Sequence, residues 1–142
     1  MSEPVSERLI EQRLRNRIME SVLGLTLGDA EVRAHGASDF FNSFYDQIPH
    51  HAHGGLHPNS ALNADERAAL LRLSQIVDEA CDATPREMTV DQLIATGWPG
   101  RIQPVARAAL ELMMQRGRFR EDVEEDEPSA EDGWMDWVCK EG

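Results

Sequence analysis

The apolar positions near the start of the chain recur at the spacing of an α-helix. Between residues 2 and 24 they fall every three or four positions, and most charged side chains fall on other faces of the same cylinder. The apolar stripe consists of Val5, Leu9, Ile10, Leu14, Ile18, Val22 and Leu23. The residues expected on the other faces are Glu7, Glu11, Arg15 and Glu20. The pattern predicts a helix that Ser2 or Ser6 caps and that Gly24 ends.

A short helix and an aromatic helix are predicted next. Residues 29–34 lie between two glycines and can form the short helix. Ser38 then caps a stretch that Pro49 stops and whose large side chains share one face. These side chains are Phe40, Phe41, Phe44, Tyr45 and Ile48. We expect this aromatic stripe to pack in the core, against the helices that contain Leu73 and Leu110, rather than to line a ligand site.

Capping boxes mark two helix starts in the second half of the chain. Asn63 stands three residues before Glu66, and Thr89 stands three residues before Gln92, so each pair can satisfy backbone N–H groups at a helix start. The first of these helices is predicted to end before Pro85. Its apolar side consists of Leu70, Leu73, Val77, Ala80 and Cys81.

A last helix is predicted beyond Gly97, which stops the short helix that Thr89 opens. Residues 98–100 are expected to form a turn, and the helix then carries Pro104 in its first turn and ends at Gly117. Its apolar stripe consists of Ile102, Ala106, Ala109, Leu110 and Met113. No alternation typical of strands occurs. The predicted fold class is therefore all-α, a small helical bundle of about four main helices with one or two short ones and a charged C-terminal tail.

The distribution of charge separates a body from this tail. The net charge is −12, yet residues 1–120 carry 16 acidic and 13 basic side chains, whereas residues 121–142 carry ten acidic residues and one lysine. We therefore expect a helical domain in residues 1–120 and an acidic tail in residues 121–142. Residues 121–133 have the composition of a disordered segment, so their backbone is expected to stay solvated.

Trp134, Trp137 and Val138 are the apolar part of the tail and would share one face of a helix. Because two exposed indoles would leave an apolar patch, we expect this segment to dock onto a groove of its own bundle or onto a partner.

Two groups of arginines can form a surface that holds either the acidic tail or a partner. The first group is Arg8, Arg13, Arg15 and Arg17, and the second is Arg116, Arg118 and Arg120. The alternative is that they are solvated faces balanced by neighbouring glutamates, which contribute little. The candidate partner-binding residues are Trp134, Trp137, Val138, Arg13, Arg17, Arg118 and Arg120.

Residues 49–58 read PHHAHGGLHP and contain four of the five histidines. The candidate metal ligands are His50, His51, His53 and His57, whose imidazoles suit zinc or nickel and could also respond to pH. The loop lies between two prolines and lacks the helical scaffold that holds the two histidines of a zinc protease motif. We therefore expect weak metal binding rather than a closed structural site.

Composition narrows the class of protein further. The chain of 142 residues is long enough for one domain with a core. No run approaches the ~20 apolar residues of a membrane span, and the first residues are acidic where a signal peptide would be basic. We expect a cytoplasmic protein with no membrane contact and with both cysteines reduced. An acidic chain is also a poor candidate for nucleic-acid binding.

The sequence contains no catalytic motif of the common hydrolase, nucleotide-binding or redox classes, so we expect no enzyme activity. The favoured hypothesis is a non-enzymatic, acidic protein–protein interaction module, such as a toxin-neutralising immunity protein or an adaptor that covers a basic partner. A homodimer is compatible with it. The alternatives are a small transition-metal-binding or sensing protein that uses residues 50–57, and a metal-dependent enzyme with that loop at its mouth.

Overall fold

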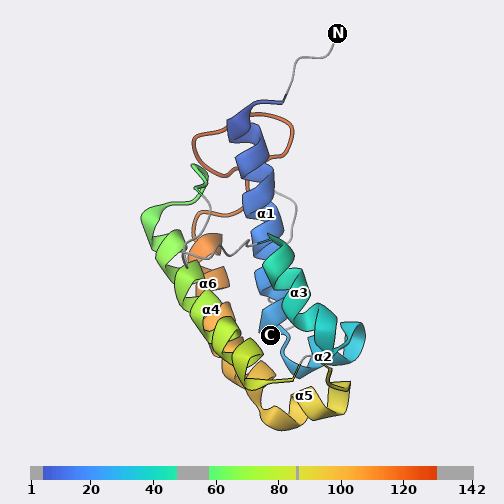
Figure 1. Cartoon of the computed structure of the whole chain (residues 1–142). Helices are drawn as coiled ribbons and strands as arrows, with labels where there is room; N and C mark the ends of the chain where they lie inside the picture. Colours follow the sequence, from blue (N-terminus) through green and yellow to red (C-terminus); the bar gives the residue numbers. More distant parts are fainter. Residues whose placement is uncertain (1–4, 48–57, 86, 131–142) are drawn as a thin grey trace.

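The computed structural model describes residues 5–47, 58–85 and 87–130, and these form a helical bundle (Figure 1). The helices in these ranges are α1 (Glu7–Thr26), α2 (Asp29–His35), α3 (Ala37–Gln47), α4 (Ala64–Ala83), α5 (Val90–Thr96) and α6 (Trp98–Met114). The same ranges contain no strand, only an isolated β-bridge between Arg118 and Ala130. The all-α prediction is confirmed.

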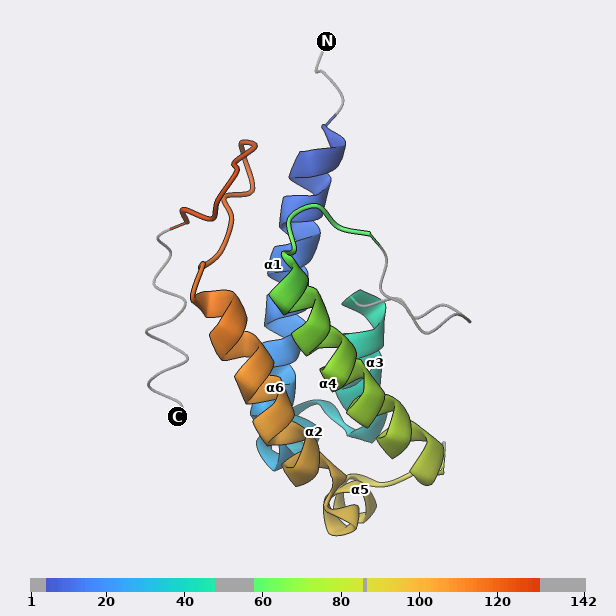
Figure 2. The same cartoon turned by 90° about the vertical axis from the view of Figure 1, so that its left-hand side faces the viewer.

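The main helices are α1, α4 and α6, with the shorter α3 beside them. Helix α6 packs against both α1 and α4, and α3 lies along the second half of α1 (Figures 1 and 2). Helices α2 and α5 close the end of the bundle at which α1 ends and α6 begins (Figure 1). In the described part of the chain, no helix combines the length and the apolar character that crossing a membrane requires.

Both capping boxes form as predicted. The Asn63 side chain accepts from the backbone N–H of Glu66 at 2.8 Å, and the Glu66 carboxylate accepts from the backbone N–H of Asn63 at 3.1 Å. Thr89 and Gln92 make the equivalent pair at 3.1 and 2.9 Å. Each box satisfies backbone donors that would otherwise lack a partner at the start of a helix, which explains where α4 and α5 begin.

The aromatic stripe of α3 packs in the core, as expected. Phe40 and Phe44 are buried, and Phe41 and Tyr45 are partly buried against the same cluster. Helix α3 packs mainly against α1 and α2 rather than against α4 and α6. Tyr45 nevertheless reaches α4, where its hydroxyl donates to Asp78 at 2.5 Å. Residue Ile48 lies outside the described ranges.

The start of α6 differs from the prediction. Residues 98–100 are not a separate turn but the first turn of the helix, with Pro99 near its N-terminus. Gly97, at φ +80°, both ends α5 in a left-handed conformation and precedes α6. Pro104 therefore lies inside the helix, where its ring nitrogen cannot donate to the carbonyl of Gly100. The predicted stop of α1 at Gly24 was also early, because the helix continues to Thr26.

The first half of α1 buries a different face from the predicted one. Val5, Ile10 and Leu14 are about half exposed. The fully buried side chains there are the polar Gln12, Arg15 and Asn16, so the expectation that Arg15 lies away from the buried face was wrong. The physical reason is that Gln12 and Asn16 face the polar chain after α6, whereas Arg15 faces the buried Glu66 carboxylate of α4.

Candidate functional site

The first part of the acidic tail lies on the N-terminal half of α1, and we call residues 118–127 the strap (Figure 1). Gln12 donates to the carbonyls of Arg120 and Val123 at 3.1 and 2.8 Å and accepts from the N–H of Glu125 at 2.8 Å. Arg13 donates to the carbonyl of Glu121 at 2.9 Å. The expectation of a solvated backbone is therefore wrong for this part of the tail, because side chains of α1 replace water as its hydrogen-bond partners.

Phe119 anchors the strap in the core. Its side chain is 1% exposed, and the backbone of Phe119 forms a pair of hydrogen bonds with the Asn16 side chain at 2.8 and 3.2 Å. The guanidinium carbons of Arg8, Arg15 and Arg116 lie 5.2, 5.2 and 5.6 Å from the centre of its ring. Cation–π contacts of this kind join the strap to α1 and to the end of α6. The sequence analysis missed this anchor, although an isolated phenylalanine between two arginines was a signal for it.

A buried ionic cluster lies beneath the strap. Arg15 and Glu66 have fully buried side chains and form a two-bond pair at 2.7 and 3.3 Å. Arg116 donates to the same carboxylate at 2.7 Å. Arg15 also donates to the carbonyls of Met113 and Gly117 at 3.2 and 2.8 Å, at the end of α6 and just beyond it. The cluster thus connects α1, α4 and the end of α6.

The arginines proposed as partner-binding residues make contacts within the chain. Arg17 pairs with Glu121 at 2.7 Å and also with Glu20. Arg118 is mostly buried and lies 3.5 Å from Glu20, and Arg120 pairs with Asp122 at 2.7 Å. Together with Arg13, these contacts favour the alternative in which the arginines hold the acidic tail. Their role in binding a partner stays a prediction.

The remaining candidates lie outside the described residues. They are His50, His51, His53, His57, Trp134, Trp137 and Val138. Within the described ranges, no three His, Cys, Asp or Glu side chains are grouped so that they could hold a metal ion. Zinc or nickel binding by the histidine loop therefore stays a prediction.

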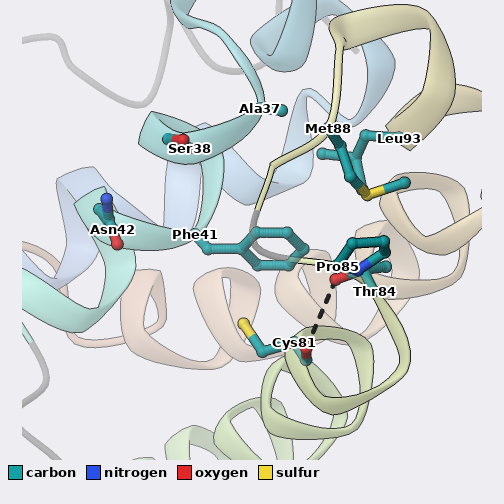
Figure 3. A pocket seen from close by; sticks show the side chains of 9 residues that line it. All are labelled: Ala37, Ser38, Phe41, Asn42, Cys81, Thr84, Pro85, Met88 and Leu93. Carbon is teal, nitrogen blue, oxygen red and sulfur yellow. Dashed lines mark hydrogen bonds between the residues drawn. The ribbon is translucent and has the colours of Figure 1, made fainter.

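A pocket of about 340 Å³ opens between α3, the end of α4 and the chain leading into α5 (Figure 3). The ring of Phe41 points into it from α3, toward Pro85 and Met88 (Figure 3). Leu93 and Cys81 complete its apolar lining, and Ser38, Asn42 and Thr84 add polar groups. The sequence did not predict this pocket, because α3 is distant in the chain from the other lining residues.

The Cys81 thiol in the pocket lining and the neighbouring Tyr45 hydroxyl are held in their neutral forms. Burial raises the pKa of the Cys81 thiol; its hydrogen bond with Tyr45 acts in the opposite direction, and the nearby Asp78 and Asp82 carboxylates raise it further. Burial and the hydrogen bond to Asp78 also raise the pKa of Tyr45 strongly. Neither group is therefore prepared to act as an anionic nucleophile.

Acidic residues surround the pocket in sequence. Asp39 lies between the lining residues Ser38 and Phe41 of α3, Asp78 and Asp82 flank Cys81, and Glu87 and Asp91 flank Met88. The described residues of α3, α5 and the second half of α4 include no lysine or arginine; Arg86 lies outside the described ranges. The pocket therefore combines an apolar lining with acidic residues close to it in sequence, of which Asp78 and Asp82 act electrostatically on Cys81.

Comparison of this chain with models of protein families, with curated proteins and with solved structures finds no match. The fold and the surfaces described above are therefore the basis for any assignment of function.

Proposed function

We propose that this protein is a non-enzymatic, acidic protein–protein interaction module that binds a partner with a basic surface. The observation that carries the proposal is the pocket between α3, α4 and α5, with its apolar lining and acidic surroundings. A partner would insert an apolar side chain beside Phe41 and place lysines or arginines against Asp82 and Glu87. Buried apolar anchors surrounded by charged contacts are the usual arrangement of such interfaces.

The distribution of arginines supports the same proposal. Those of α1 and of residues 116–120 contact the strap, Glu20 or Glu66, so they neutralise acids at one end of the bundle. The described residues of α3, α5 and the second half of α4, by contrast, include acids but no arginine or lysine. The raised pKa values of Cys81 and Tyr45 support a binding role over a catalytic one.

An immunity protein that neutralises a basic toxin, or an adaptor in the cytoplasm, is the particular form of module that we propose. Acidic surfaces of this kind accelerate association with a basic partner, and salt weakens that effect. The proposal therefore includes an association rate that falls as ionic strength increases.

The test begins with capture of a binding protein from native extract by crosslinking, followed by its purification and a titration. The pocket variant carries Asp82→Lys and Glu87→Lys. Its matched control carries Glu124→Lys and Asp126→Lys, which change the net charge equally at exposed positions of the strap. We expect the pocket variant to bind at least ten times more weakly than the control. Equal losses would show that only net charge matters, and unchanged binding by the pocket variant would remove the pocket from the interface.

The metal-binding alternative has its own test. Protein purified without a tag or metal column should contain no stoichiometric zinc or nickel. A submicromolar site that His53→Ala abolishes would favour the alternative in which residues 50–57 define the function.

A further inference from the structure

A second concave surface is lined by residues of α4 and α6, the two helices that lie in front of α1 in Figure 2. This groove has a volume of about 530 Å³ and follows α6 from Pro104 to Gln115. Its apolar lining consists of small or medium side chains, among them Ala69, Val105, Ala108 and Leu112. Arg72 and Glu111 are its charged lining residues. Small side chains between two helices leave room for larger ones from another segment.

We propose that residues 131–142 of this chain, the terminal segment, dock in the groove between α4 and α6. The side chains of Trp134, Trp137 and Val138 would fill the groove and contact its apolar lining. This is an intramolecular contact, separate from the pocket near Cys81 and independent of any partner.

The path of the chain favours this groove. The backbone N–H of Ala130, the last described residue, donates to the carbonyl of Arg118 at 2.9 Å. Arg118 follows Gln115, the end of the groove, by only three residues. The terminal segment therefore begins next to the open end of the groove and needs no long connection to enter it.

The length of the segment also fits. Gln115, the C-cap of α6, lies eleven positions after Pro104, which corresponds to about 16 Å along the helix axis. The twelve residues of the terminal segment would span about 18 Å as a helix, and more in an extended conformation. Either conformation can cover the groove.

Charge distinguishes this groove from the pocket near Cys81. The terminal segment carries Glu131, Asp132, Asp136 and Glu141 against Lys140. Arg72 lines the groove, and Arg107, outside the lining, is exposed on α6, so each offers a cation to the acids of the segment. The pocket is surrounded by aspartates and glutamates and would repel it. Glu111, in the groove, can face Lys140.

Tryptophan fluorescence of the full chain tests the proposal. Trp98→Phe leaves Trp134 and Trp137 as the only tryptophans, and circular dichroism confirms that this background is folded. We expect blue-shifted emission and protection from acrylamide. Adding Ala108→Glu and Leu112→Glu should shift the emission to the red and raise the quenching constant at least threefold. Adding Ala64→Glu and Ala95→Glu, at exposed helix positions outside the groove, should change neither.

Each of the other outcomes overturns the proposal. If acrylamide quenches Trp134 and Trp137 of the Trp98→Phe protein as strongly without urea as in urea, the segment does not dock. Emission that depends on protein concentration would assign the contact to a second copy of the chain. Equal sensitivity to both pairs of glutamates would place the segment elsewhere.

Cys139 provides a second, independent measurement. In a Cys81→Ser background, we introduce a cysteine at Val105 or at Ala108 and oxidise the protein under mild conditions. Docking predicts a monomeric disulfide with Cys139 for at least one of the two positions, because disulfides form only when the Cα atoms lie within about 7 Å. Ala95→Cys is the control and should not crosslink. A dimeric disulfide, or none, contradicts the intramolecular contact. Both measurements use the isolated protein, so their failure would leave the proposed function untouched.

Discussion

Replacing Glu66 by Gln removes the negative charge at the centre of the buried cluster while keeping the size of the side chain. The remaining amide oxygen can still accept from the backbone of Asn63, so the helix cap can persist. The amide nitrogen, however, would then take the place of Oε2 and point a donor at Arg15, which is itself only a donor. Arg15 would then be a fully buried cation without its carboxylate.

The expected loss follows from that burial. Removing one partner of a buried ion pair costs about 3–5 kcal/mol, because the other charge stays out of water uncompensated. Glu127→Gln is the matched control, since Glu127 pairs with Arg116 at 3.2 Å but is 75% exposed. Exposed pairs contribute about 1 kcal/mol or less. The double variant Arg15→Met, Glu66→Met should lose much less than the sum of the two single changes.

Urea unfolding followed by far-ultraviolet circular dichroism measures these differences, with an unchanged slope confirming that the same transition is compared. A loss below about 1 kcal/mol for Glu66→Gln would refute the reasoning. It would mean that water or a rearranged carbonyl compensates Arg15, and that the cluster does not hold α1, α4 and α6 together.

Three further predictions concern the packing of the bundle and its turns. Phe44→Ala should cost about 3–5 kcal/mol in urea unfolding because the ring is fully buried, whereas Phe41→Ala, partly exposed in the pocket, should cost less than about 2 kcal/mol; equal losses would contradict this assignment of burial. Tyr45 has a raised pKa in the folded state, while the unfolded chain ionises near ~10, so stability is retained below that pH and lost as pH rises above it. Phenolate absorbance should therefore appear only with unfolding, and its appearance near ~10 in folded protein would contradict the burial. Gly97→Ala should cost about 1–2 kcal/mol because φ is +80°, while Gly100→Ala, in a helix with open space around it, should stabilise by about 0.5–1 kcal/mol in thermal unfolding.

The parts of the fold that the sequence predicts are those with local signals. Asn63 and Thr89 start their helices through bonds that reach only three residues along the chain. The apolar stripes of α4 and α6 are buried as predicted, except that Cys81 is only partly buried, because these helices pack against each other. The first-turn proline of α6 is Pro99 rather than Pro104, and its position after Gly97 is itself a helix-start signal.

The first half of α1 shows where periodicity fails. Hydrophobic periodicity identifies the buried face of a helix only where that face is apolar, as it is when one helix packs on another. Here the covering segment presents backbone carbonyls, so the buried positions need donors such as Gln12 and Asn16, while Ile10 and Leu14 face outward. Asn16 donates to the backbone carbonyl of Phe119, which lies 103 residues later in the chain, so no local sequence pattern predicts this contact. The pocket near Cys81 was missed for the same reason.

The way in which α1 fastens the strap has a consequence for how this protein can change. Four side chains of α1 donate to backbone carbonyls of the strap, and every residue has such a carbonyl whatever its side chain. These donors are Arg8, Gln12, Arg13 and Asn16. Substitution of the exposed acidic residues of the strap should therefore leave its hydrogen bonds with α1 intact. Losing a single residue would instead displace each later carbonyl by about 3.5 Å, beyond the reach of its donor. The strap should therefore tolerate substitutions at its exposed acidic positions but not the deletion of a residue.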